Sequence, residues 1–214
     1  MNVASGDSGP EKLVAPRWQG DGVSKTQYYT ATTIDGYIAD PHNSLDWLFA
    51  VDEGREDEAG ANPFATFFAG VGAFVMGATT YEWILDHESL LTRPEKWQEY
   101  YGDVPSWVFT HRDLPPIPGA DLRFVQGDVR PVHAAMTAAA GEKNIWVTGG
   151  GELAGAFDDA GLLDEVILGV APATLGAGAP VLPRRIMPSR LTLTGVEKRG
   201  QFAYLTYAVT PPTS

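Results

Sequence analysis

The segment Ile145-Trp146-Val147-Thr148-Gly149-Gly150-Gly151-Glu152-Leu153 decides the fold of this chain. Its pattern is that of a short apolar strand that runs through three consecutive glycines into a helix, which we expect over 153–160. Glycine permits positive φ and lets a ligand approach the main chain closely. The helix directs unpaired N–H groups and the positive end of its dipole toward that ligand. Such a junction is typical of a phosphate or pyrophosphate site, although a turn without a ligand has the same pattern.

A second junction of the same kind occurs earlier in the chain, at Phe74-Val75-Met76-Gly77-Ala78-Thr79-Thr80-Tyr81-Glu82. Two strand–glycine–helix junctions in one chain favour a nucleotide ligand over two empty turns. The late glycines also fit a loose dinucleotide fingerprint, but that motif usually follows the first strand of its domain. The position therefore indicates a different nucleotide-binding fold.

Strand and helix patterns alternate along the chain, which favours an α/β fold with a mostly parallel sheet. The end of the chain differs, because apolar and polar residues alternate on both sides of Arg199-Gly200 and predict an antiparallel hairpin. We interpret the charged and aromatic segment 87–104 as a surface excursion. The expected strands are 27–33, 73–76, 106–110, 122–125, 145–148 and 165–170, and the expected helices are 63–69, 79–85, 131–140 and 153–160.

Composition restricts the class of protein. The net charge of −12 argues against a nucleic-acid partner, whose surface of contact is normally basic. The chain has no cysteine, which excludes disulfides, thiolate catalysis and cysteine-based zinc sites and fits a cytoplasmic protein. His42, His87 and His133 have no metal-ligand spacing, and no apolar run could span a membrane. We expect a flexible leader over 1–26 and a single domain over 27–210.

Five segments occur in the order and at the spacing of the dihydrofolate reductase superfamily. Within it the chain resembles the riboflavin-biosynthesis reductase branch, which is typified by the RibD C-terminal domain. The resemblance implies a central, mostly parallel twisted sheet flanked by helices, with a C-terminal antiparallel hairpin. The segments that carry it are 33–39, 75–82, 108–112, 147–153 and 172–182.

The resemblance also implies an activity. The chain is expected to be an NADPH-dependent reductase that transfers hydride to a small heterocyclic substrate of the pterin or ribosylaminopyrimidine type. Two alternatives remain open, namely a true dihydrofolate reductase and a non-catalytic NADPH-binding module. Because this branch is commonly dimeric, we also expect a homodimer, with apolar contact area from 97–101 and from the terminal hairpin.

Each part of the cofactor is assigned residues through the resemblance. Backbone groups of Ala31, Ile38 and Ala39 would flank the nicotinamide, and Gly77, Ala78, Thr79 and Thr80 would open a helix onto the phosphates. Thr110, His111 and Arg112 would surround the adenosine 2′-phosphate, while Gly149, Gly150, Gly151, Glu152 and Leu153 would cradle the pyrophosphate.

Two features distinguish this chain from the family pattern. The family often has Arg or Lys where this chain has Ala78, so Arg112 is left as the main fixed cation for the 2′-phosphate. Folate reductases carry an acidic residue after a tryptophan-containing loop, and counting from Trp47 favours Asp52 as that acid, with Asp46 second. The alternative for both carboxylates is a solvated surface role, since 52–58 is a charged run.

Overall fold

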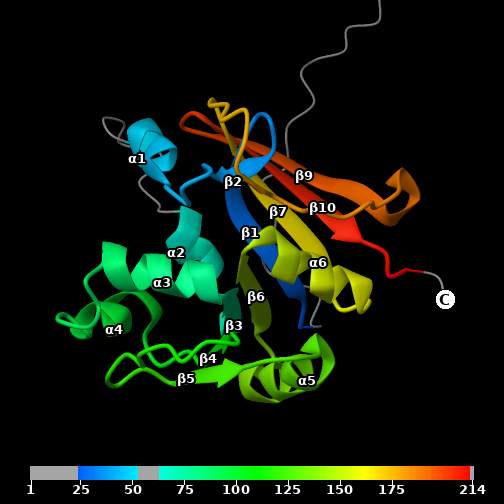
Figure 1. The fold of residues 1–214 in the computed structure, drawn as a ribbon. Helices are drawn as coiled ribbons and strands as arrows, with labels where there is room; N and C mark the ends of the chain where they lie inside the picture. Colours follow the sequence, from blue (N-terminus) through cyan, green and yellow to red (C-terminus); the bar gives the residue numbers. More distant parts are fainter. Residues whose placement is uncertain (1–23, 53–62, 213–214) are drawn as a thin grey trace, which may run out of the picture.

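The computed structural model describes residues 24–52 and 63–212, and Figure 1 shows their arrangement. Its main sheet has the strand order β5-β4-β3-β6-β1-β7-β10-β9. From β5 to β7 neighbouring strands run parallel, whereas β10 is antiparallel to both β7 and β9. The predicted α/β fold with a terminal antiparallel hairpin is therefore confirmed. The strands are β1 (Thr26–Thr33), β2 (Tyr37–Ala39), β3 (Val71–Gly77), β4 (Ser106–Phe109), β5 (Leu122–Val125), β6 (Asn144–Gly149), β7 (Glu165–Ala171), β8 (Ala179–Pro180), β9 (Leu191–Arg199) and β10 (Phe202–Val209).

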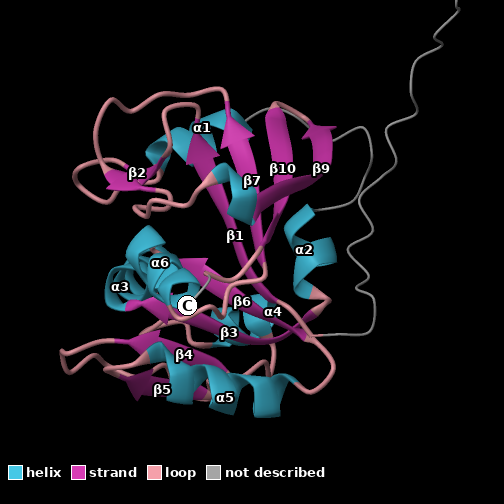
Figure 2. Cartoon of the chain, turned by 90° about the vertical axis from the view of Figure 1, so that its right-hand side faces the viewer, coloured by secondary structure: helices cyan, strands magenta, loops and turns pink. Residues whose placement is uncertain are grey.

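Helices cover both faces of this sheet, as Figures 1 and 2 show. Side chains of α5 and α6 pack on one face, and side chains of α2, α3 and α4 pack on the other. The strand β3 reads as a nearly continuous apolar run because its alternate residues are buried on both faces. The helices are α1 (Asp46–Asp52), α2 (Pro63–Phe68), α3 (Ala78–His87), α4 (Glu95–Tyr101), α5 (Val129–Ala140), α6 (Gly151–Asp159) and a short 3₁₀ turn (Pro188–Arg190).

The segment 87–104 is not the surface excursion that its charge predicts. It contains α4, whose Trp97 is only 1% exposed and stacks on Phe74 with ring centroids 5.9 Å apart. Trp97 and Tyr101 are four residues apart, so a helix places both on one face, and both rings lie against Phe74. The charged residues of this segment occupy the rest of the helix surface. In the sequence they are interspersed with the apolar residues, so the segment looks polar although one side of the helix is buried.

Several boundaries also differ from the predicted ones. β1 begins at Thr26, one residue earlier than expected, while α6 begins at Gly151 and includes the last glycine of the motif. α5 begins two residues before Pro131 because the side chain of Asp128 accepts a hydrogen bond from the amide of Arg130 and caps the helix. The proposed leader falls, over residues 1–23, outside the described part of the chain.

The sheet forks between its two central strands. β1 pairs with β6 only from Thr26 to Tyr28, the last pair being Tyr28 with Val147. Beyond that point β1 continues along β7 as far as Thr33, and β6 continues along β3 to Gly149. The carboxyl ends of β1 and β6 therefore diverge, which is the place where open α/β sheets usually bind ligands. None of the helices described has the length and apolar character that a membrane crossing requires.

Candidate functional site

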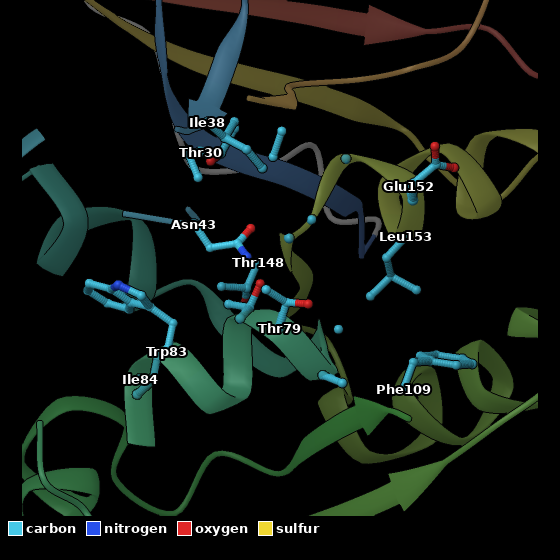
Figure 3. A pocket seen from close by; sticks show the side chains of 18 of the residues that line it. Thr30, Ile38, Asn43, Thr79, Trp83, Ile84, Phe109, Thr148, Glu152 and Leu153 are labelled. Atoms are coloured by element: carbon cyan, nitrogen blue, oxygen red, sulfur yellow. The ribbon is translucent and has the colours of Figure 1, made fainter. Parts of the chain in front are cut away.

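A cavity of about 750 Å³ occupies the fork between β1 and β6. Figure 3 shows Trp83 and Ile84 at one end, Phe109 and Leu153 at the other, and Thr148 between them. Phe109 and Leu153 pack against the core under α5 and α6, whereas Ile84 belongs to the core under α2, α3 and α4. The cavity thus extends from one face of the sheet to the other through the fork, and its volume is within the usual range of small-molecule and cofactor sites.

Two helices present uncapped N-termini to this cavity. The N-cap residues are Gly77 for α3 and Gly150 for α6, and within the described residues neither helix receives a side-chain cap. A Cβ built on Gly77 would lie 3.7 Å from the carbonyl oxygen of Gly149, so the two helix starts are neighbours. Gly149 itself has φ of +145°, a conformation that favours glycine. The free N–H groups and the dipoles of both helices therefore converge on one place suited to an anion.

The segment 172–182 closes the cavity on the side of α6. A Cβ on Gly151 would collide with the carbonyl oxygens of Pro180 and Val181, and a Cβ on Gly178 would collide with the carbonyl oxygen of Ala39. Glycine at these two positions lets the backbones of α6, β8 and β2 pack directly on one another. This packing fixes the start of α6 relative to β2, which pairs with β8.

Most of the residues assigned to the cofactor line the cavity together. Ala31, Ile38 and Ala39 come from β1 and β2, and the others come from the two glycine junctions. This juxtaposition of segments far apart in the sequence could not be derived from either junction alone. The cofactor-assigned residues that line the cavity are Ala31, Ile38, Ala39, Gly77, Ala78, Thr79, Thr80, Gly149, Gly150, Gly151, Glu152 and Leu153.

The three residues assigned to the 2′-phosphate lie outside the cavity lining, just after β4. The hydroxyl of Thr110 accepts a 2.9 Å hydrogen bond from the amide of Arg112. The ring of His111 is 3.2 Å from the side-chain oxygen of Gln126, and the Arg112 guanidinium pairs with Glu82 of α3 at 2.7 Å. Their role toward a 2′-phosphate stays a prediction, in which the phosphate would compete with Glu82 for Arg112.

The two candidate acids are placed differently by α1. Asp46 is the first residue of this helix, and its side chain is exposed and does not line the cavity. Asp52 is its last residue, and the Asp52 side chain lies outside the described part of the structure. Trp47 and Leu48 do line the cavity, so α1 contributes to the site through its apolar residues. The assignment of the proton donor stays a prediction.

The charge balance of the lining is unusual for an anion site. Among the described residues that line the cavity, Glu152 is the only carboxylate, and none is Lys or Arg. Glu152 lies in the first turn of α6, where it accepts a 2.8 Å hydrogen bond from Arg184. Hydrogen bonds to Glu152 and then to Asp159 raise the pKa of Arg184. Arg184, which also pairs with Asp159, therefore offsets part of the negative charge that would repel an anion at this helix start.

Aromatic residues to which no cofactor role is assigned make up the other end of the cavity. Tyr29, Trp83, Tyr101 and Trp146 form aromatic walls there. Burial raises the pKa of Tyr101 to about 12 and raises the pKa of Tyr29 further, so both phenols are neutral at physiological pH. No binding role was predicted for Thr148, although it belongs to the quoted strand–glycine–helix motif. Its place directly before Gly149 is the signal that could have indicated such a role.

The loop before α1 contributes a polar residue, Asn43. Asn43 has φ of +60°, and its amide donates to the carbonyl oxygen of Asp40 at 3.0 Å. The carboxylate of Asp40 accepts hydrogen bonds from the amides of His42 and Ser44, each at 2.8 Å. This turn positions Asn43 on the cavity wall, as seen in Figure 3, and its only local signal is an Asp three residues before an Asn.

Comparison with known proteins places this geometry in a family. The uncharacterized protein YwjB of Bacillus subtilis (strain 168) is 32% identical over 188 residues, which cover 86% of this chain and 97% of that protein. A putative riboflavin biosynthesis protein from Shewanella sp. PV-4 is similar in structure, with a TM-score of 0.65 and 23% identity over 87% of this chain and 99% of that one.

Dihydrofolate reductase from Enterococcus faecalis, solved with NADP(H), has the same fold at a TM-score of 0.52 and 13% identity, over 86% of this chain and 96% of that one. The likeness to both solved structures is one of fold. The sequence itself matches the RibD C-terminal domain over residues 25–204, well over half of its length. The chain therefore belongs to the RibD C-terminal domain family.

Proposed function

We propose that this protein is an NADPH-dependent reductase that transfers hydride to a small heterocyclic substrate of the ribosylaminopyrimidine or pterin type. The observation that carries the proposal is the pair of uncapped helix N-termini, at Gly77 and Gly150, that meet at the fork of the sheet. Membership of the RibD C-terminal domain family supports it, as does the shared fold with a dihydrofolate reductase that was solved with NADP(H).

The residues at the fork fit a dinucleotide. The N–H groups at the starts of α3 and α6 would hold its phosphates, since they are free and adjacent. Phe109, Val129 and Leu153 give the end near α5 and α6 an apolar lining suited to a flat base. Ala31 and Ile38 on the β1 side would flank the nicotinamide. When bound, the cofactor supplies a hydride to the acceptor carbon, and the acceptor's heteroatom gains a proton.

The opposite end of the cavity suits a planar heterocycle. Aromatic side chains of Tyr29, Trp83, Tyr101 and Trp146 surround it, and they exclude water from the place where the hydride is transferred. Asn43 and Thr148 are polar residues of the same lining that can recognise ring N–H and carbonyl groups. The bound ring would thus be oriented by few polar contacts within an apolar pocket, as in most small-molecule sites.

A pair of variants at Gly77 tests the binding mode. Gly77 has φ of −81° and ψ of 163°, and a Cβ there makes ordinary van der Waals contacts, so other residues fit without strain. Gly77→Ser and Gly77→Asp should both cap α3 and leave the protein as stable as the wild type or a few tenths of a kcal/mol more stable. We expect Gly77→Ser to weaken NADPH binding less than Gly77→Asp, which should lose at least about tenfold, because both caps occupy N–H groups that the phosphates would use and the carboxylate also repels the phosphates.

Thermal unfolding of the wild type provides the direct measurement. NADPH at 100 times its dissociation constant should stabilise the protein by about 2.7 kcal/mol. Oxidation of NADPH is then followed with a ribosylaminopyrimidine, a dihydropterin and dihydrofolate as acceptors. Turnover of dihydrofolate alone would identify a true dihydrofolate reductase. Binding without turnover of any acceptor would favour a non-catalytic module, and no thermal shift with NADPH or NADH would refute the proposal.

A further inference from the structure

The hydroxyl of Thr148 is buried and has no hydrogen-bond partner. Within the described residues, only the indole nitrogens of Trp47 and Trp97 share this condition. Trp97 belongs to the core and is not part of the cavity lining, whereas Thr148 and Trp47 both line the cavity. Buried hydroxyls in folded proteins almost always have a partner, so an orphan on a cavity wall indicates a partner that arrives with a ligand.

The close view of the cavity places Thr148 among polar side chains of the lining. Thr148 lies at an irregularity of the sheet, because Val147 pairs with Val75 of β3 and Gly149 pairs with Met76, which leaves Thr148 between two paired residues. Trp146 belongs to the core under α2, α3 and α4, and Val147 belongs to the core under α5 and α6. Thr148 is the next residue of β6 and lines the cavity, and Figure 3 shows it between Asn43 and Thr79.

The fork explains why the protein itself leaves this hydroxyl without a partner. At Val147, β6 is still paired with Tyr28 of β1, but the next residue of β6 has no β1 residue beside it. The hydroxyl of Thr30, which also lines the cavity, is directed to the carbonyl oxygen of Ala31, at 3.2 Å. Valine would fill the position of Thr148 equally well in a strand, without burying a polar group. The hydroxyl therefore stabilises neither the strand nor the core of the free protein.

We propose that Thr148 is a substrate-positioning residue, whose hydroxyl forms a hydrogen bond with a ring N–H or carbonyl group of the heterocycle. This inference rests on the reductase function proposed above and names the contact that orients the acceptor ring. A hydroxyl both donates and accepts, so it can serve either group of an amide-like ring edge. The bond forms inside an apolar enclosure, where a hydrogen bond is stronger than in water and where losing it costs more free energy.

The test compares Thr148→Val with Thr148→Ser. Valine keeps the volume and branching and removes the hydroxyl, while serine keeps the hydroxyl. We expect Thr148→Val to melt at the same temperature as the wild type or higher, and to bind NADPH with an unchanged dissociation constant. Its kcat/KM for the acceptor that the wild type reduces should fall roughly 5- to 150-fold. Thr148→Ser should retain most of the wild-type value.

Equilibrium binding separates this inference from the proposed function. The ribosylaminopyrimidine, dihydropterin and dihydrofolate are titrated against the NADPH complex, with quenching of tryptophan fluorescence as the signal, since Trp83 and Trp146 line the cavity. If the wild type binds one of these probes without reducing it, the reductase proposal fails, yet weaker binding to Thr148→Val still supports the contact.

Three results would overturn the inference. A lower melting temperature of Thr148→Val with unchanged acceptor affinity would indicate a purely structural hydroxyl. An equal loss of NADPH and acceptor affinity would assign the hydroxyl to the cofactor. Failure of all three probes to bind the wild type would leave Thr148 without the class of ligand that we assign to it.

Discussion

The indole nitrogen of Trp146 donates a 3.0 Å hydrogen bond to the backbone carbonyl oxygen of Tyr29. The bond connects β6 to β1 one residue beyond Tyr28, which is the last residue of β1 that pairs with β6. At the point where the sheet forks, the Trp146 side chain thus replaces the backbone hydrogen bonds between the two strands. It satisfies the carbonyl group of Tyr29, which has no residue of β6 paired beside it. Both residues line the cavity, so the same bond holds two of its aromatic walls together.

Trp146→Phe should therefore destabilise the protein by about 1–3 kcal/mol beyond the cost of the smaller ring, because it leaves the Tyr29 carbonyl unsatisfied. Urea unfolding measures the change. Trp97→Phe is the matched control, since the same atoms are removed but the Trp97 indole nitrogen has no partner to lose. Equal destabilisation by the two substitutions would show that the bond across the fork contributes nothing.

Arg112 provides a prediction about cofactor preference. If it holds the 2′-phosphate, the contact should contribute about 10- to 150-fold in favour of NADPH over NADH. Arg112→Ala should then remove most of that preference and leave NADH affinity nearly unchanged. In the structure Arg112 pairs with Glu82 at 2.7 Å, and both side chains are well exposed.

Glu82→Gln is the complementary variant, because it releases Arg112 from its present partner. We expect it to strengthen NADPH binding severalfold and to leave NADH binding unchanged. Dissociation constants for both cofactors, measured at one low salt concentration, decide the matter. A parallel loss of NADPH and NADH affinity in Arg112→Ala would instead indicate damage to the fold or to the pyrophosphate site.

His133 should make stability depend on pH. Burial lowers the pKa of His133, outweighing the opposing effect of Asp164, and its ring nitrogen lies 2.8 Å from the hydroxyl of Thr26. A folded-state pKa below the unfolded value of about 6.5 means that the unfolded chain binds more protons in that window. The contribution of neutral His133 to the free energy of unfolding is therefore fully present above about pH 6.5 and is lost as the pH falls through the folded-state pKa of His133.

Urea unfolding at a series of pH values from about 7.5 to about 5 should show this loss of stability in the wild type. His133→Gln retains a side chain that can bond Thr26 but cannot titrate, so its profile should be flatter in the same range. Identical profiles for the two proteins would exclude His133 as the source of the pH dependence.

The predicted homodimer now has a more specific candidate surface. Trp97 is buried and can offer no contact area, but Leu193 and Val196 of β9 are 51% and 44% exposed. β9 is an edge strand of the main sheet, and an exposed edge with apolar side chains favours association with another chain. We expect light scattering at tens of micromolar to give the mass of a dimer.

Leu193→Lys combined with Val196→Lys should shift the protein toward the monomer, because charges oppose burial of this strand. Leu91→Lys serves as the control, since Leu91 is 53% exposed but lies in the turn after α3 rather than on the hairpin. A monomeric wild type would refute the dimer and leave the reductase proposal intact.

Local features of the sequence were sufficient to predict much of this fold. The strand–glycine–helix junctions at Gly77 and Gly149 were recognisable because they depend on backbone freedom and helix starts, which neighbouring residues determine. The terminal hairpin was recognisable because alternation on both sides of Arg199-Gly200 is a short-range pattern. The two junctions also carried part of the resemblance from which a nucleotide cofactor was expected.

Other features depended on contacts between distant segments, and only the tertiary structure decided them. The fork between β1 and β6 results from which strand each one continues to pair with, and strand pairing has no local code. The burial of Trp97 and the pairing of Arg112 with Glu82 likewise require partners far away in the sequence. Thr148 is ordinary as a residue of a strand, and it becomes distinctive only because the neighbouring strand turns away and leaves its buried hydroxyl without a partner.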